Sequence, residues 1–163
     1  LMELVCTGVA LETEELAKKG VRVLIIGDRS RFSDKVKAAL NRIESNTAHG
    51  QTMTLILALN YSSRSEITSA VRSLAERVAA GELKPEQIDE QMISASLYTA
   101  QIPDPDLIIR SSGECRLSNF LMWQASYSEF YFTDVLWPDF NKEELDKALE
   151  AYAERDRRYG LVK

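Results

Sequence analysis

Short apolar runs alternate along this chain with stretches in which apolar residues recur every three or four positions. Three runs are almost continuously apolar, namely Val21–Ile26, residues 53–59 and residues 107–109. Runs of this length are typical of strands that are covered on both faces of a sheet. A fourth run, residues 129–136, is rich in aromatic and β-branched side chains and is closed by Pro138. The pattern therefore predicts four strands.

Amphipathic stretches follow these runs and predict helices. Three of them carry apolar stripes, formed by Val36, Leu40 and Ile43, by Ile67, Val71, Leu74 and Val78, and by Leu145, Leu149 and Tyr152. Ser33 and Asn141 stand where helix N-caps are expected, and Ser63 with Glu66 has the spacing of a capping box. Gly81 is expected to end the middle helix.

Strands that alternate with helices predict an α/β fold, with a parallel-sheet core flanked by helices. The chain has 163 residues, 45% of them apolar, which predicts a single domain over residues 1–163. Parallel sheets bind ligands beyond the carboxyl ends of their strands. Because Asn60, Arg64 and Arg110 follow strand ends, we expect these three side chains to line one rim.

Charge and hydropathy argue against two classes of function. The formal net charge of −5 argues against non-specific nucleic-acid binding, so we expect no nucleic-acid partner. The sequence has no run of about 18 or more apolar residues, so it predicts no membrane-spanning helix.

The strongest candidate for chemistry is the segment after the third strand. Arg110 ends the strand, a turn of small residues follows, and Arg116 and Ser118 come next. We expect Ser118 and Asn119 to open an apolar helix, whose first N–H groups would attract an anion. Arginine guanidiniums match phosphate oxygens in pairs, so the segment predicts a phosphate site. The alternative is a structural loop with surface salt bridges.

Two adjoining stretches of this segment resemble a known family. Residues 110–119, RSSGECRLSN, are similar to the R-[TS]-[GS]-G-E-x-R-[LIV]-S-N signature of the cis-prenyltransferases, the undecaprenyl diphosphate synthase family. Residues 120–140, FLMWQASYSEFYFTDVLWPDF, are similar to that family's F-L-x-W-Q-x-x-Y-x-E-x-Y-F-x-D-x-L-W-P-D-F. The resemblance extends less densely over nearly the whole chain, and it implies the cis-prenyltransferase fold.

The resemblance implies roles for several residues. Those it places at the site of isopentenyl diphosphate, or in turns near it, are Arg110, Arg116, Ser118, Arg158, Gly160, Asn60 and Arg64. Arg158 and Gly160 belong to an R-x-G ending that in the family reaches the site across a dimer interface, whereas basic residues near a helix end are the structural alternative. Glu114 is expected to orient an arginine by pairing with it.

Glu129 is the candidate metal ligand. In the family, the glutamate of Y-x-E-x-Y-F supports Mg²⁺ and diphosphate, and carboxylate oxygens suit Mg²⁺. The alternative is that Glu129, which lies among aromatic residues, forms a buried salt bridge with Arg110 or Arg116. The family's D-G-N loop, whose aspartate works with Mg²⁺, does not occur in this sequence, so no catalytic residue is assigned.

The implied reaction joins isopentenyl diphosphate to an allylic diphosphate such as farnesyl diphosphate and forms a cis-polyprenyl diphosphate. We expect a C-terminal portion of a longer protein that acts as a homodimer. We expect the protein to be located in the cytoplasm or at the membrane periphery, where its lipid product would hold it. Targeting to an organelle stays open. The alternatives are a non-catalytic partner subunit and an inactive fragment that only binds diphosphate.

Overall fold

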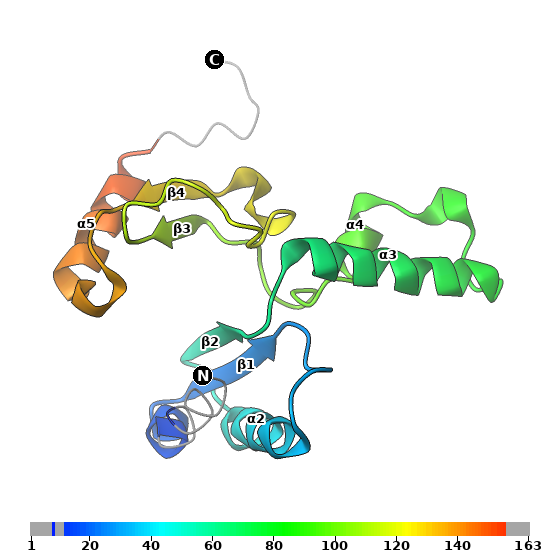
Figure 1. Cartoon of the computed structure of the whole chain (residues 1–163), viewed down its shortest axis with the longest axis horizontal. Helices are drawn as coiled ribbons and strands as arrows, with labels where there is room; N and C mark the ends of the chain where they lie inside the picture. The colour runs from blue at the N-terminus through cyan, green and yellow to red at the C-terminus, as the bar shows by residue number, and fades with distance from the viewer. Residues whose placement is uncertain (1–7, 9–11, 156–163) are drawn as a thin grey trace. The chain divides into compact units, whose positions relative to one another are not determined.

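The computed structural model describes residue 8 and residues 12–155 of the chain. The chain divides into two compact units, Leu1–Ala100 and Gln101–Lys163, and each is described by itself (Figure 1). Both units pair parallel strands and pack helices against them, which confirms the predicted α/β class. Among the described residues, no helix is both long and apolar enough to cross a bilayer.

The first unit is built on two parallel strands, β1 (Val21–Ile26) and β2 (Met53–Ala58), paired from Val21↔Met53 to Ile26↔Ala58. Helix α2 (Asp34–Thr47) connects them and packs on β1. The core consists of buried apolar residues of β1 and α2, namely Val23, Ile25, Val36, Leu40 and Ile43. This unit therefore forms where the apolar run and the apolar stripe predicted it.

Side chains of α2 also cover the outer edge of β1. The backbone N–H of Val23 donates to the Thr47 hydroxyl at 3.0 Å, and that of Ile25 donates to the Glu44 carboxylate at 2.9 Å. An unpaired strand edge exposes N–H groups that would otherwise pair with another chain. Helix α2 thus satisfies two edge groups as well as burying one face of the strand.

The remaining helices of the first unit are α3 (Ser63–Ala79), the 3₁₀ turn η1 (Pro85–Gln87) and α4 (Glu90–Ser94). The N-cap of α3 is Ser62, whose hydroxyl accepts from the N–H of Ser65, so the predicted capping box of Ser63 and Glu66 is wrong. Glu66 is instead buried and accepts from the Tyr98 N–H. Gly81 ends the helix as predicted, with a φ of 75°.

The second unit pairs β3 (Leu107–Arg110) with β4 (Glu129–Phe132) in parallel, from Leu107↔Glu129 to Arg110↔Phe132. Two 3₁₀ turns flank β4, η2 (Gln124–Tyr127) and η3 (Trp137–Asp139). Helix α5 (Lys142–Ala153) contacts β4 and is capped by Asn141, as predicted.

Two sequence predictions in the second unit are wrong. Strand β4 has four residues and stops at Phe132, short of the predicted residues 129–136. The segment after Ser118 contains turns and η2 in place of the predicted α-helix. Positive φ values of 49° at Ser118, 64° at Asn119 and 45° at Leu121 are incompatible with a right-handed helix. A helix N-terminus therefore does not contribute to the candidate phosphate site.

Candidate functional site

Arg110 is held by the loop that follows it. Its Nη1 donates to the Ser118 hydroxyl at 2.9 Å and also to the backbone carbonyl of Arg116. Its own carbonyl accepts from the Thr133 N–H at 3.0 Å, just beyond β4. The loop between these residues is thereby closed by one guanidinium. Three predicted site residues, Arg110, Arg116 and Ser118, are brought together in this way.

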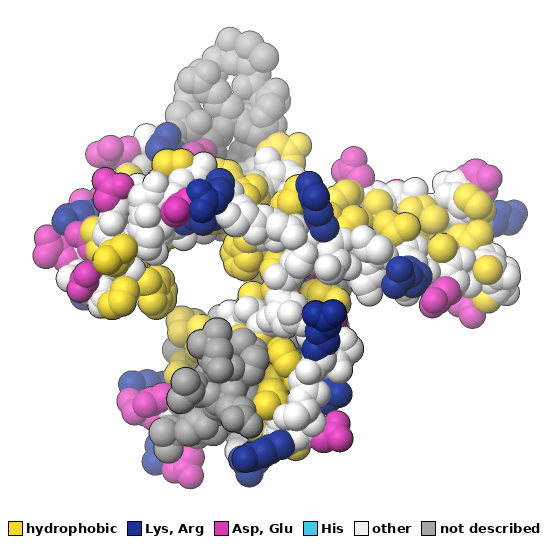
Figure 2. All heavy atoms as spheres, viewed as in Figure 1, with side chains coloured by type: hydrophobic (Ala, Val, Ile, Leu, Met, Phe, Trp, Pro, Cys, Tyr) yellow, Lys and Arg dark blue, Asp and Glu magenta, His cyan; other side chains and the backbone are white. Residues whose placement is uncertain are grey.

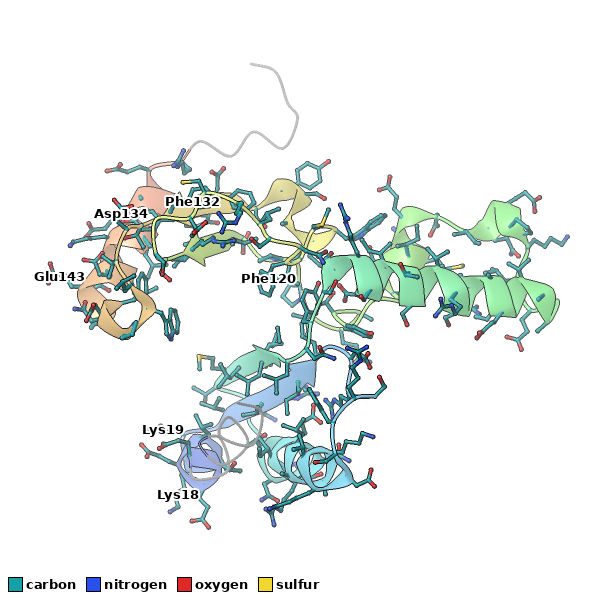
Figure 3. All side chains as sticks on the ribbon, viewed as in Figure 1. Lys18, Lys19, Phe120, Phe132, Asp134 and Glu143 are labelled. Carbon is teal, nitrogen blue, oxygen red and sulfur yellow. The ribbon has the colours of Figure 1, made fainter. Side chains whose placement is uncertain are left out.

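The turn of small residues is fastened to the segment after β4. The Ser112 N–H donates to the Val135 carbonyl and the Gly113 N–H to the Thr133 carbonyl, both at 2.9 Å. Gly113 has a φ of 69°, and a Cβ there would lie 2.9 Å from Oδ1 of Asp134, which Figure 3 labels. Only glycine fits this turn without a shift of Asp134. The turn fixes where the two arginines leave the backbone.

Arg116 forms an ion pair with Glu114, as expected from the sequence. Both side chains are well exposed to solvent, so the pair adds little to stability. Its consequence is geometric, since Glu114 holds one side of the guanidinium. The arginine keeps other N–H groups that can donate to an anion.

A cavity of about 270 Å³ lies between the loop and β4. Arg110, Arg116 and Ser118 form its polar part, and the apolar part comes from Ile108, Ile109, Leu117, Phe120, Phe130 and Phe132. The rings of Phe130 and Phe132 lie parallel, with centroids 6.0 Å apart. Figure 3 labels Phe120 and Phe132 on the loop and the strand. The cavity suits a small ligand that has an anionic end and an apolar end.

Glu129 begins β4 and is partly buried, with 29% of its side chain exposed. Its Oε2 lies 3.9 Å from Nε of Arg155, and no ion pair joins it to Arg110 or Arg116 among residues 12–155. The predicted salt bridge to those arginines is therefore wrong. Within the same residues, no three acidic, histidine or cysteine side chains gather as a metal site would need. Glu129 fits Mg²⁺ as one carboxylate ligand, in the manner of sites that are completed by phosphate and water.

Asn60 and Arg64 belong to the first unit. Asn60 has a φ of 49°, and its Nδ2 donates to the Asp28 carbonyl at 2.9 Å, so its amide ties the end of β2 to the end of β1. Arg64 lines another cavity, which also includes Arg72. Arg110 belongs to the second unit, so the rim shared by Asn60, Arg64 and Arg110 stays a prediction. Arg158 and Gly160 lie outside the described residues.

Sequence reasoning missed two features of this site. Arg155 pairs with Glu129 across 26 positions of the chain, a contact for which no local pattern gives a signal. Phe130 and Phe132 line the cavity from one face of β4. Their alternation in a strand-like run was a usable signal for the latter, because residues two apart share a face of a strand.

Comparisons with known proteins identify the family of this chain. The family model for undecaprenyl diphosphate synthase matches residues 1–160. An isoprenyl transferase from Brucella abortus is 54% identical over 148 residues, which are 91% of this chain and 58% of that protein. A ditrans,polycis-undecaprenyl-diphosphate synthase, specific for (2E,6E)-farnesyl diphosphate, from Xanthomonas axonopodis is 47% identical over 162 residues, 99% of this chain and 63% of that protein.

A solved structure gives the same result for the fold. The crystal structure of lavandulyl diphosphate synthase from Lavandula x intermedia, in complex with dimethylallyl diphosphate, matches with a TM-score of 0.94 and 36% identity. The match covers 98% of this chain and 70% of that one.

The chain has a parallel α/β fold that carries a cavity lined by two arginines and by apolar side chains. The chain belongs to the undecaprenyl diphosphate synthase family of prenyltransferases. It spans 58% to 63% of the length of the curated relatives described above.

Proposed function

We propose that the protein that carries this chain is a cis-prenyltransferase. It condenses isopentenyl diphosphate with an allylic diphosphate such as farnesyl diphosphate, and it forms a polyprenyl diphosphate with new cis double bonds. The observation that carries the proposal is the cavity of the second unit, which combines Arg110, Arg116 and Ser118 with an aromatic wall. Isopentenyl diphosphate has two parts that match those of the cavity, a charged diphosphate and a five-carbon apolar group.

The residues of this chain would act by binding and orienting isopentenyl diphosphate. Arg116 and Arg110 would neutralise its diphosphate, and Phe120, Phe130 and Phe132 would contact its hydrocarbon part. The double bond then forms a carbon–carbon bond to C1 of the allylic partner, whose carbon–oxygen bond breaks and releases diphosphate, and a proton leaves the new chain. Held in place, the double bond meets its partner without the entropy cost of a free encounter.

Mg²⁺ is the cofactor that fits this proposal, since it neutralises charge that develops on a departing diphosphate. Glu129 would be its ligand from this chain, and Arg155 would hold that carboxylate when the metal is not bound. We further propose that the protein works as a homodimer, in the cytoplasm or at the membrane periphery, where its lipid product partitions.

Turnover of labelled isopentenyl diphosphate with farnesyl diphosphate and Mg²⁺ tests the proposed function. Replacing Arg116 by Ala should lower kcat/KM by about 100-fold, which corresponds to the loss of a charge-assisted contact of about 3 kcal/mol. Arg42→Ala is the matched control, because Arg42 is exposed on α2 and lines neither cavity. Equal turnover in both variants, or a product whose new double bonds are trans by NMR, would rule the proposal out.

A further inference from the structure

One face of helix α3 in the first unit carries only hydrogen-bond donors and hydroxyls. Arg64, Thr68 and Arg72 lie four residues apart along it, with Ser65 and Ser69 beside them. Residues with this spacing share one side of a helix. The five side chains line an open cavity of about 430 Å³, which Asp28 and Tyr98 also border. None of these residues takes part in the cavity of Arg110.

The wall of this cavity is fixed by a buried carboxyl group. Glu66 is 1% exposed, and its Oε1 accepts from the backbone N–H of Tyr98 at 2.8 Å. Its Oε2 accepts from the hydroxyl of Tyr61 at 2.6 Å. Tyr98 is thereby tied to α3 across 32 positions of the chain. The side of the cavity at Tyr98 is therefore held in place without a ligand, which reduces the entropy cost of binding.

The charges in the cavity favour an anion. Two guanidiniums face a single carboxylate, that of Asp28. Within the part of the chain that the structure describes, the guanidinium of Arg72 forms no hydrogen bond or ion pair. Asp28 stays ionised at neutral pH, because hydrogen bonds from the Ser30 side chain and backbone lower the pKa of its carboxyl. Figure 2 shows basic side chains, in dark blue, scattered over the visible face and not gathered into one continuous patch.

We propose that this cavity is a second anion site, which binds a diphosphate group between Arg64 and Arg72 with Ser65, Thr68 and Ser69 as further partners. The two arginines leave α3 about 12 Å apart along the axis, and their long side chains can converge on one group of this size. The ligand is either free diphosphate or the head group of a prenyl diphosphate. The proposal stands without the proposed enzymatic activity, because it concerns other residues and a binding readout.

Calorimetric titration of the full protein with inorganic pyrophosphate tests this site. An Arg110→Gln, Arg116→Gln background removes the charges of the other cavity. In that background, Arg72→Gln should weaken binding by about tenfold or more, the loss expected of one charge-assisted contact. Arg77→Gln is the matched control, because Arg77 is exposed on the same helix but does not line the cavity. Its affinity for pyrophosphate should equal that of the background.

A second substitution gives an effect of the opposite sign. Asp28→Asn keeps an oxygen that can accept from the Ser30 N–H, at 2.8 Å from Oδ1 in this structure, but removes the negative charge. It should tighten pyrophosphate binding, which a variant that merely loosens the fold would not do. Circular dichroism of each variant confirms that it is folded.

Titration with isopentenyl diphosphate distinguishes the two sources of the ligand. Equal affinities for it and for pyrophosphate assign the site to the free diphosphate, and tighter binding of the ester assigns it to a prenyl head group. Either result supports an anion site. The proposal is overturned if the background binds neither ligand, or if Arg72→Gln and Arg77→Gln bind pyrophosphate equally.

Discussion

At the scale of single residues, the proposed substrate site depends on how Arg110 is aimed. Its guanidinium extends across the loop that follows it and donates to the Ser118 hydroxyl and to the Arg116 carbonyl. A flexible arginine would lose side-chain entropy on meeting a diphosphate, and about 2 kcal/mol of rotamer freedom is at stake. The loop removes part of that freedom in advance. We therefore expect Ser118 to act on the ligand partly through Arg110.

Ser118→Ala should raise the KM for isopentenyl diphosphate by about tenfold, the effect of losing one hydrogen bond to a charged group. The free energy of unfolding should change by less than about 0.5 kcal/mol, because Ser118 is exposed. Steady-state kinetics and urea unfolding measure the two effects. Ser126→Ala is the control, since Ser126 is exposed and bonds only its local Trp123 carbonyl. If both variants show the same KM, Ser118 does not position the arginine.

Glu66 shows how one buried polar residue organises a region. Its two carboxyl oxygens accept from Tyr98 and Tyr61, which lie on opposite sides of it in sequence. Glu66→Ala should lower the free energy of unfolding by about 3 kcal/mol, because two partly buried donors lose their acceptor and the buried side chain leaves a void. Glu66→Gln should cost much less, since an amide oxygen can accept from Tyr98 while its NH₂ donates to the Tyr61 hydroxyl. Urea denaturation compares the two, and equal losses would show that charge, not hydrogen bonding, is what matters there.

At the scale of elements, much of the fold could be predicted from the sequence because the signals are local. Val21–Ile26 forms the strand that its continuous apolar run predicted, and Ser33 caps α2 as its spacing predicted. The predictions that were wrong failed because of contacts outside the local sequence pattern. Glu66 did not close a capping box because its partner, Tyr98, lies 32 positions away. The helix expected after Ser118 does not form, because the Ser118 hydroxyl turns back and accepts a hydrogen bond from Arg110 at the start of the loop.

The same division applies to the candidate site. The two arginines and Ser118 could be predicted because they stand in one short segment of sequence. The partner of Glu129 could not be predicted, because Arg155 lies just after α5, and α5 meets β4 only in the folded chain. Arg64, Thr68 and Arg72 have a helical spacing in the sequence, but their cavity also needs Asp28 and Tyr98 from two other segments.

The connection of β1 to β2 gives a test at this scale. Gly27 follows β1 with a φ of 115°, and a Cβ there would lie 2.1 Å from the Leu59 carbonyl oxygen. Gly27→Ala should therefore cost about 3 kcal/mol or more, from the backbone conformation and from the clash together. Gly81→Ala is the matched control, because Gly81 has a φ of 75° but nothing lies within 4 Å of the added carbon. It should cost only about 1 kcal/mol.

Urea unfolding of the two glycine variants measures the difference. A cost at Gly27 no larger than the cost at Gly81 would mean that the loop shifts away from Leu59 without penalty. The close approach of the two strand ends would then not determine where Asp28 and Asn60 lie.

At the scale of the whole molecule, the net charge of −5 contrasts with ligands that are themselves anionic. The net charge of this chain gives no long-range attraction for a diphosphate, so we expect binding to depend on local groups. Each cavity described here supplies two arginines within its own unit. In the proposed homodimer, the R-x-G ending at Arg158 would add a third cation to the Arg110 site from the partner subunit.

Mixing two inactive variants tests this proposed exchange between subunits. Arg116→Ala and Arg158→Ala should each lower kcat/KM for isopentenyl diphosphate by about 100-fold, so that each variant alone is nearly inactive. If Arg158 acts on the partner's site, a mixed dimer has one site with both arginines and one with neither. Random mixing after unfolding and refolding together should then restore about a quarter of the wild-type rate, since about half of the dimers are mixed and half of their sites are intact.

If Arg158 acts within its own subunit, every site lacks one arginine and the mixture stays inactive. Refolded wild-type protein sets the recoverable rate, so an inactive mixture beside an active control would contradict the shared site.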